Sequence, residues 1–420
     1  MSNYEEHFLK VINFLKLYEK LIDCHLVDFL TEDLWENCLP RDFKLYLETN
    51  GNNIFRKIEQ FNELTKHEDS KLYTFLRNVK ALKLESCQNI ITRCDFLNVL
   101  NYENAKVYKT IPSEFMKVKK CHEVDVFTKT IVWLNQNKSS VIIDAGAGKG
   151  YSSLYLSNYY NLPVLCIECS LINHNSAILH RSLVNKKNKR STSLINYAVE
   201  QIDETTDFVQ LVKNYFPNLH PQRELVMTAL HACGSLTDSV IKSFLNVSDI
   251  RCLCIVPCCY HFTSKSLSSL YEFSKNSRML AQQSTDRINH KNEFLSPSLF
   301  YRAVLQVVFR LLGIKNTTIG RGAPLDNFLI YAKWALKKVN AKEVPTDEIL
   351  EKTYEEFKDY KWKFNIFQLL RIQLAPVVEA AIILDKILFI HKFNICTKLE
   401  VVQLFDPLLS PRNWAIIATK

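Results

Sequence analysis

The chain has 420 residues, 47% hydrophobic and 23% charged, enough for about two or three globular domains with a substantial core. Its formal net charge of +9 is a mild basic bias spread along the chain, which does not by itself identify a nucleic-acid partner. No secretory signal opens the sequence, and the apolar stretch 380–390 is too short to span a bilayer. The 13 cysteines are therefore expected to be free thiols in a reducing compartment. We expect a cytoplasmic protein, with the nucleus as the alternative, and no membrane partner.

Residues 1–115 are predicted to form an N-terminal helical region. Apolar residues recur there at helical spacing, as in the run Phe8, Val11, Ile12 and Leu15. The region shows no catalytic constellation, so it is expected to act as a helical cap or as a docking surface for substrate.

A further helix is predicted over residues 117–137. Val124, Phe127, Ile131 and Leu134 form one apolar stripe along it. Its first turn carries Lys119, Lys120 and His122, either on a solvated face or facing a ligand.

The glycine-rich stretch 141–150 contains three of the eight glycines. It reads as a buried strand, a turn and the start of a helix near Tyr151, an arrangement that lets backbone N–H groups approach a ligand. The order Asp144-x-Gly146-x-Gly148-x-Gly150 is that of S-adenosylmethionine (SAM) sites. The spacing fits neither a dinucleotide fingerprint nor a phosphate loop. Because the helix over 117–137 directly precedes this strand, Lys120 is expected to face the cofactor carboxylate.

Glu168 supplies a second signal for the same cofactor. It ends the apolar run 164–167 and follows Gly148 by 20 residues. In a doubly wound sheet, an acidic residue about 20 positions after the glycines accepts hydrogen bonds from ribose hydroxyls. A solvated carboxylate at a strand end is the alternative.

Two later apolar runs, 225–230 and 252–256, are predicted as buried parallel strands. His231 follows the first and Tyr260 follows the second, at the edge where ligands bind in open α/β sheets. His231 is the candidate base for methyl transfer, because imidazole titrates near neutrality. Tyr260 is the candidate for positioning an acceptor. The alternatives are a loop contact for His231 and packing for Tyr260.

The cysteines near these strand ends raise the question of a metal. His231, Cys233, Cys258, Cys259 and His261 are numerous enough for zinc, but they lack paired Cys-x-x-Cys spacing. Buried, unreactive thiols are therefore expected, and no metal site is predicted.

After residue 262 the pattern is helical, over 267–280, 299–312, 327–336 and 377–389, before two short apolar runs at 399–405 and 413–419. These runs are predicted to be the last two strands of the sheet, with 414–418 pairing with 252–256. The predicted fold is therefore an α/β class I SAM-methyltransferase (Rossmann-like) sheet. Its parts are an N-terminal helical region (1–115), a core with strands 1–5 (116–262), a helical insertion between strands 5 and 6 (263–395) and the two final strands (396–420).

Several blocks together resemble the methyltransferase-like protein 25 family, in the same order from Lys119 almost to the last residue. They are Lys119-Lys120-x-His122-Glu123-Val124, Asp144-x-Gly146-x-Gly148-Lys149-Gly150, Leu230-His231-x-Cys233-Gly234-x-Leu236-Thr237, Cys258-Cys259-Tyr260, Met279-Leu280-Ala281-x-Gln283-Ser284 and Phe405-Asp406-Pro407-x-Leu409-Ser410-Pro411-Arg412-Asn413. One departure is Pro257, where the family usually has glycine.

The resemblance implies a SAM-binding methyltransferase domain without an established acceptor. The sequence His231-Ala232-Cys233-Gly234 differs from the Asn/Asp-x-x-Tyr/Phe motif of ribosomal RNA adenine dimethylases. A more distant similarity to eukaryotic tRNA ribose 2′-O-methyltransferases favours RNA over protein as the acceptor. The predicted function is thus a SAM-dependent methyltransferase. The alternative is a catalytically silent protein of the same fold that binds a partner.

Overall fold

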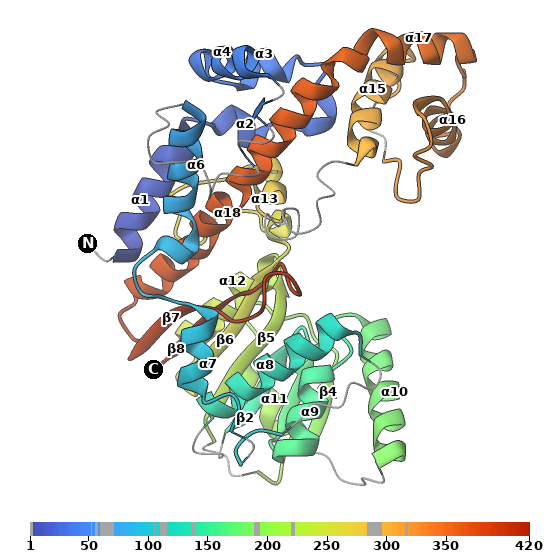
Figure 1. Cartoon of the computed structure of the whole chain (residues 1–420). Coiled ribbons are helices and arrows are strands. Elements are labelled where there is room, and N and C mark those ends of the chain that lie inside the picture. The colour runs from blue at the N-terminus through green and yellow to red at the C-terminus, as the bar shows by residue number, and fades with distance from the viewer. Residues whose placement is uncertain are drawn as a thin grey trace. The chain divides into compact units, whose positions relative to one another are not determined.

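The computed structural model describes residues 3–51, 53–54, 58, 71–104, 106–109, 116–135, 140–188, 194–219, 223–283, 296–315 and 318–420 (Figure 1). The chain divides into two compact units. Unit 1 comprises Met1–Leu9, Leu84–Phe273 and Glu379–Lys420, and unit 2 comprises Lys10–Lys83 and Ser274–Val378. Helices α1 (Asn3–Lys16) and α18 (Lys361–Lys392) contribute residues to both.

Unit 1 is built on an eight-stranded sheet with the strand order β1-β7-β8-β6-β5-β2-β3-β4. Its strands are β1 (Ile90–Ile91), β2 (Val141–Ala145), β3 (Val164–Ile167), β4 (Ile195–Ala198), β5 (Leu225–Cys233), β6 (Ile250–Cys258), β7 (Lys398–Gln403) and β8 (Trp414–Thr419).

Strand β8 is antiparallel to both of its neighbours, whereas the other pairs in the sheet are parallel. It pairs with β6, where Ile416 lies opposite Ile255, and with β7. The pairing expected between 414–418 and 252–256 is therefore present, with β7 and β8 shifted by one or two residues from the expected bounds. The predicted α/β class with a helical insertion between the fifth and sixth of its core strands is confirmed.

The edge strand β1 was not anticipated, because residues 1–115 are predicted to be helical. Ile90 and Ile91 pair in parallel with Val401 and Val402 of β7. Two residues are too few to show the alternation that identifies a strand in a sequence. Together with helix α7 (Arg93–Leu100), β1 makes the end of the N-terminal region part of unit 1.

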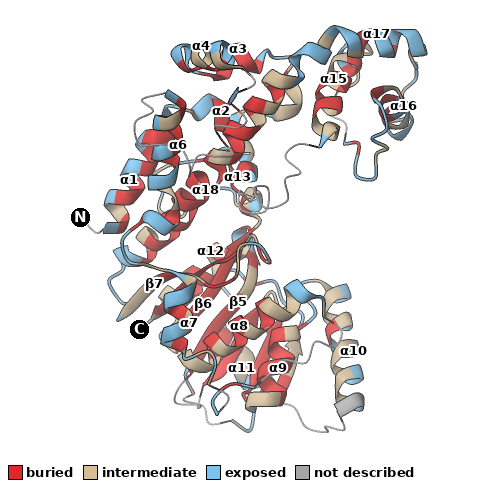
Figure 2. Ribbon diagram, in the orientation of Figure 1, coloured by how far each residue is buried: buried red, intermediate tan, exposed pale blue. Residues whose placement is uncertain are grey.

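Helices cover both faces of the sheet. Helices α7, α8 (Val118–Leu134) and α9 (Tyr151–Tyr160) share one hydrophobic core with inward-facing residues of the strands. On the other face, α12 (Ser235–Asn246) contacts β5 and β6, where Met227 and Leu253 are fully buried. Coverage of both faces explains why the central strands are rich in apolar residues. Strands β2, β3, β5, β6 and β8 are buried along most of their length (Figure 2). Unit 1 also contains α10 (Leu171–Asn188) and α11 (Phe208–Tyr215).

Unit 2 is helical in its described residues. Besides parts of α1 and α18 it contains α2 (Glu19–Asp23), α3 (Leu34–Cys38), α4 (Arg41–Asn50), α6 (Lys71–Leu82), α13 (Lys275–Leu280), α15 (Pro297–Leu311), α16 (Phe328–Lys338) and α17 (Asp347–Phe357). Aromatic pairs hold the N-terminal helices to the insertion helices. Phe29 packs edge-on against Phe364, and Trp35 does the same against Trp362.

The helix predicted over 267–280 is shorter in the structure, where only Lys275–Leu280 are helical. The N–H groups of Leu267 and Ser268 donate instead to the Asp385 carboxylate, and Ser266 donates to Glu272. Side-chain hydrogen bonds of this kind compete with the helical pattern in serine-rich segments.

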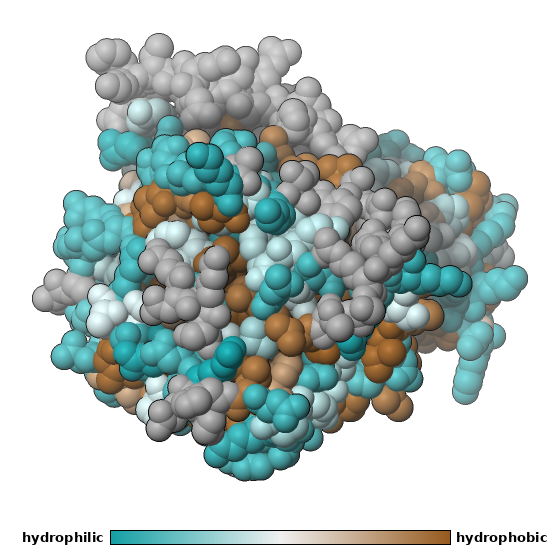
Figure 3. All heavy atoms as spheres, turned by 90° about the horizontal axis from the view of Figure 1, so that it is seen from below, coloured by the Kyte–Doolittle hydropathy of each residue, from teal (hydrophilic) through white to brown (hydrophobic). Residues whose placement is uncertain are grey.

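Among the described residues, no helix combines the length and apolar composition needed to cross a membrane. On the face drawn in Figure 3, the hydrophobic side chains that are coloured lie in separate patches among hydrophilic ones.

Candidate functional site

A cavity of about 740 Å³ lies in unit 1 at the carboxyl ends of the parallel strands. Its walls come from the loop after β2, from the residues that follow β3 and β4, and from the end of β5 with the start of α12. The lining residues are Lys120, Asp144, Gly146, Ala147, Gly148, Lys149, Tyr151, Ser152, Ile167, Glu168, Cys169, Asn173, Glu200, Gln201, Ile202, Leu230, His231, Cys233, Ser235 and Leu236. Of the predicted site residues, all but Gly150 and Tyr260 lie on this wall.

The glycine loop after β2 uses three left-handed backbone conformations. Gly146, Gly148 and Gly150 have φ angles of +69°, +56° and +63°, which side-chain-bearing residues rarely adopt. A Cβ atom on Gly146 would lie 2.7 Å from Leu236, whereas a Cβ on Gly148 would meet nothing within 4 Å. Gly148 therefore presents bare backbone to open space on the cavity wall, which fits the close approach of a ligand.

Glu168 and Gly148, the two halves of the expected cofactor signature, are in direct contact. The Gly148 N–H donates to Oε2 of Glu168 at 2.9 Å, and the Ser170 N–H donates to Oε1 at 2.9 Å. These bonds hold the carboxylate at the cavity wall. Oε1 also accepts a weak hydrogen bond from the Cys169 thiol, whereas Oε2 keeps a further lone pair that can accept a hydrogen bond from a ligand's hydroxyl group.

Asp144 lies at the base of the cavity and is 2% exposed. Its carboxylate accepts hydrogen bonds from the hydroxyls of Ser152 and Ser153 on α9. Burial raises the pKa of Asp144, and the two serine hydrogen bonds partly oppose that shift. The carboxylate therefore ties the end of β2 to the first turn of α9 and fixes the loop between them.

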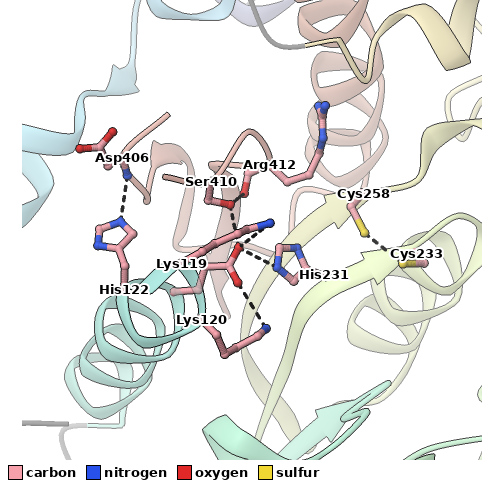
Figure 4. Close-up of polar contacts among 10 residues, drawn as sticks. Lys119, Lys120, His122, His231, Cys233, Cys258, Asp406, Ser410 and Arg412 are labelled. Carbon is pink, nitrogen blue, oxygen red and sulfur yellow. Dashed lines mark hydrogen bonds and ion pairs between the residues drawn. The ribbon is translucent and has the colours of Figure 1, made fainter. Parts of the chain in front are cut away.

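The predicted catalytic residue His231 sits at an irregularity in β5. The pairing of β5 with β6 shifts register between Ala229 and Ala232, and His231 has a φ angle of +69°. A bulge of this kind re-aims a side chain, and left-handed backbone at a non-glycine residue is often found at functional sites. His231 lies on the cavity wall, with Nε2 3.0 Å from Oε1 of Glu123 (Figure 4).

Glu123, from helix α8, is 1% exposed and is contacted by several polar side chains, among them the labelled Lys120, His231 and Ser410 of Figure 4. Besides His231, it accepts a hydrogen bond from Oγ of Ser410 at 2.7 Å, and Nζ of Lys120 lies 3.3 Å from Oε2. Burial by itself would raise the pKa of Glu123, but these partners outweigh it and hold the pKa well below its usual range. The carboxylate is therefore ionised, and Lys120 keeps a paired positive charge at the cavity wall.

The loop between β7 and β8 completes this network. The Asp406 N–H donates to Nε2 of His122 at 3.0 Å (Figure 4). Burial, with a nearby arginine, lowers the pKa of His122, which keeps the ring neutral and able to accept this bond. Two of the sequence blocks that resemble the family, at the start of α8 and in the loop before β8, thus contact each other.

Tyr260, the second predicted catalytic residue, is 2% exposed and is not among the residues that line the cavity. Its hydroxyl donates to Oε1 of Glu379 on α18 at 2.7 Å, and Arg412 also pairs with Glu379. The structure thus places the Tyr260 hydroxyl in a buried charged cluster rather than on the cavity wall.

Sequence reasoning missed several wall residues. Glu200, Gln201 and Ile202 follow β4 and face the same cavity as Glu168. These residues could have been predicted from their position in the sequence. They follow β4, the strand next to β3, so the carboxyl end of β4 reaches the same edge of the sheet. Glu123 carried no such signal, since its partner His231 is 108 residues away.

Three thiols also meet at this edge. Sγ of Cys233 lies 3.1 Å from Sγ of Cys258 and 3.5 Å from Sγ of Cys259. The hydrogen bond from Cys258 holds the pKa of the Cys233 thiol below its ordinary value.

In comparison with known proteins, residues 119–266 match the family model described as "Methyltransferase domain". The chain is 27% identical over 262 residues to the mouse probable methyltransferase-like protein 25, covering 56% of this chain and 44% of that protein. It is 28% identical over 265 residues to the human one, covering 57% and 44%. The chain therefore spans less than half the length of these curated relatives. These similarities confirm the resemblance seen in the motifs.

Among solved structures, a match covers 98% of this chain and 100% of coclaurine N-methyltransferase bound to N-methylheliamine and SAH. The TM-score of this match is 0.27 at 11% sequence identity, which is too low to indicate a shared fold. The fold class is instead given by the strand order of the sheet.

Proposed function

We propose that this chain, whose residues 119–266 form a methyltransferase domain, transfers a methyl group from S-adenosylmethionine to an acceptor that binds beside His231. The observation that carries the proposal is the contact between Gly148 and Glu168 on the wall of the cavity. The contact brings the unobstructed backbone of Gly148 and the hydrogen-bonded carboxylate of Glu168 together. Both lie at the edge of the sheet where ligands of this fold class bind.

The residues present fit the cofactor. A volume of about 740 Å³ lies within the range of small-molecule sites. Glu168 would accept hydrogen bonds from the ribose hydroxyls of SAM. Gly148, which has no side chain, leaves room for the methionine part of SAM to pass the loop. The adenine would lie toward Ile202, which is 8% exposed, and Lys120 would face the carboxylate. When bound, SAM supplies a methyl group already activated on a sulfonium.

The acceptor side of the cavity is formed by His231. With Nε2 held by Glu123, the ring has one orientation and Nδ1 is its remaining nitrogen for an acceptor. The protein's contribution is then to hold the acceptor in line with the methyl group. Tyr260, whose hydroxyl is bonded to Glu379 and which does not line the cavity, has no contact with the acceptor in this proposal.

We further propose RNA as the acceptor class, with protein as the alternative. The net charge of +9 and the distant similarity to tRNA ribose methyltransferases support this choice. The cysteines are all free, which is consistent with action in the cytoplasm or nucleus.

Cofactor binding is tested by calorimetric titration of the whole chain with SAM. Gly148→Val should weaken binding more than about tenfold, because the side chain enters the space where the ligand passes. Gly313→Val is the matched control. Gly313 also has a positive φ (+65°) and open space around it, but it belongs to unit 2 and is not a lining residue of the cavity. Equal binding by wild type and Gly148→Val, or no binding by wild type, would refute the site.

Transfer is tested separately with SAM labelled in its methyl group, incubated with RNA and protein fractions from cells that lack the gene. Label in RNA is the expected result. Label only in protein would overturn the RNA acceptor but not the cofactor site. SAM binding without transfer to either fraction would favour the alternative function, a silent domain that binds a partner.

A further inference from the structure

Three cysteines converge where β5 and β6 end, beside the proposed cofactor contacts. Cys233 and Cys258 are register partners on adjacent parallel strands, so their side chains point to the same face of the sheet. Figure 4 shows these two thiols directed at each other. With Cys259, the three sulfur atoms all lie within 4.8 Å of one another.

The backbone of Cys259 is unusual. Its φ angle is +49°, in the left-handed region that few residues with a side chain adopt. Along a regular strand, Cys259 would point away from the face that carries Cys258. Here its thiol instead lies 3.5 Å from that of Cys233, on the same side as the other two.

The arrangement suits one metal ion. Zn²⁺ binds cysteine sulfur at about 2.3 Å, which sets tetrahedral sulfur ligands about 3.8 Å apart. The Cys233 sulfur lies 3.1 Å and 3.5 Å from its two neighbours, so it need move by less than about 1 Å to admit the ion. We propose that Cys233, Cys258 and Cys259 bind one zinc ion as thiolates. Binding releases their three protons to solvent and transfers no electrons.

The fourth coordination position of such an ion would be open to the cavity through Cys233. Cys233 is exposed and lines the cavity wall, whereas Cys258 is buried behind it. Three protein ligands with one open position are typical of zinc sites that take a water molecule or a substrate atom. The ion would therefore sit on the acceptor side, close to His231, and present an exchangeable position there.

Zinc binding is independent of methyl transfer and is measured without SAM. The full chain is reduced, freed of metal by a chelator that is then removed, and reconstituted with zinc alone. Elemental analysis should find one zinc per chain, and cobalt substitution should give the intense near-ultraviolet absorption of sulfur-to-cobalt charge transfer. No bound metal, or copper in place of zinc in the protein as purified, would overturn the proposal.

Single variants locate the ligands. Cys233→Ser and Cys259→Ser should each lower zinc affinity by more than about tenfold and weaken the cobalt band, because one of the three thiolate ligands is lost. Cys252→Ser, on the same strand β6 but away from the cluster, and Cys94→Ser, at an exposed position on α7, are the controls. Circular dichroism establishes that each variant is folded.

Three outcomes of the variant series would contradict the site. They are full zinc binding by the folded Cys233→Ser/Cys259→Ser double variant, equal loss of zinc in the controls, and an unchanged cobalt band in both single variants. SAM titration of the same samples distinguishes the two proposals. Failure to bind zinc in a chain that still binds SAM would contradict the zinc site and leave the cofactor site unaffected.

Discussion

Nε2 of His231 lies 3.0 Å from Oε1 of Glu123, although 108 residues separate them in the chain. One residue stands in a bulge of β5 and the other on helix α8. A carboxylate that holds one ring nitrogen fixes which face of an imidazole is presented and which nitrogen remains for a ligand. In the proposed function, Glu123 would therefore position His231 on the acceptor side of the cavity.

Replacing Glu123 with glutamine should lower the free energy of unfolding by about 1–3 kcal/mol, because a buried, fully bonded carboxylate becomes a poorly matched amide. Denaturant unfolding at pH 7 measures the loss. Glu351→Gln, at an exposed position, is the control and should change little. Equal stability of the two variants would contradict the role assigned to Glu123.

The same variant has a pH signature. The pKa of Glu123 is lower in the folded chain than its ordinary value of 4.5, so its stabilising contribution is full above that value and is lost as pH falls below it. The difference in unfolding free energy between wild type and Glu123→Gln should therefore shrink as pH is lowered below 4.5. A difference that stays constant with pH would show that the charge of Glu123 is not what stabilises the fold.

Tyr260→Phe should cost about 1 kcal/mol of stability through the lost bond to Glu379, which keeps Arg412 as a partner. SAM affinity should be unchanged, since the hydroxyl is not on the cavity wall. Calorimetry and thermal unfolding of the same sample measure both. A large fall in SAM affinity without a change in stability would show that the Tyr260 hydroxyl contributes to the cofactor site.

Gly234→Ala should destabilise the chain by about 3 kcal/mol. The added Cβ would lie 2.6 Å from Cβ of Phe262, and the φ angle at Gly234 is +54°. Gly320→Ala is the control, because Gly320 has a φ of +80° but open space around it, and it should cost only about 1 kcal/mol. Similar losses in both variants would mean that backbone strain alone, without the contact to Phe262, decides the effect.

Ile416→Ala tests the pairing of β8 with β6. Ile416 is fully buried opposite Ile255, so the truncation should cost about 3 kcal/mol. Ile349, which is 50% exposed on α17, gives the control variant Ile349→Ala, with an expected change below about 0.5 kcal/mol. Chemical denaturation distinguishes the two, and a small loss at Ile416 would argue that β8 is dispensable.

The parts of the site that could be predicted have local signals. Three glycines within five positions and a carboxylate 20 residues after Gly148 together indicate a nucleoside-binding loop. In the structure Gly148 and Glu168 are in contact. The final strands were also predictable, because apolar runs beside an open sheet edge have few other places to pair.

What could not be predicted depends on register and on distant contacts. The network from Ser410 through Glu123 to His231 joins three segments that have no shared periodicity. The cysteines near the ends of the two strands were considered together in the sequence, but the contact between Cys233 and Cys258 depends on the register of β5 against β6. Helix α18 continues through Pro376, although proline usually signals the end of a helix.

The position of β8 between β6 and β7 has a consequence for how the chain is made. On the ribosome, β6 emerges long before β8, because the whole insertion is translated between them. Throughout that interval the apolar β6 has an unpaired edge that could join another chain. The nascent protein is therefore expected to need chaperone protection until the segment carrying Ile416 has been synthesised, and slower translation of the insertion should lengthen that exposure.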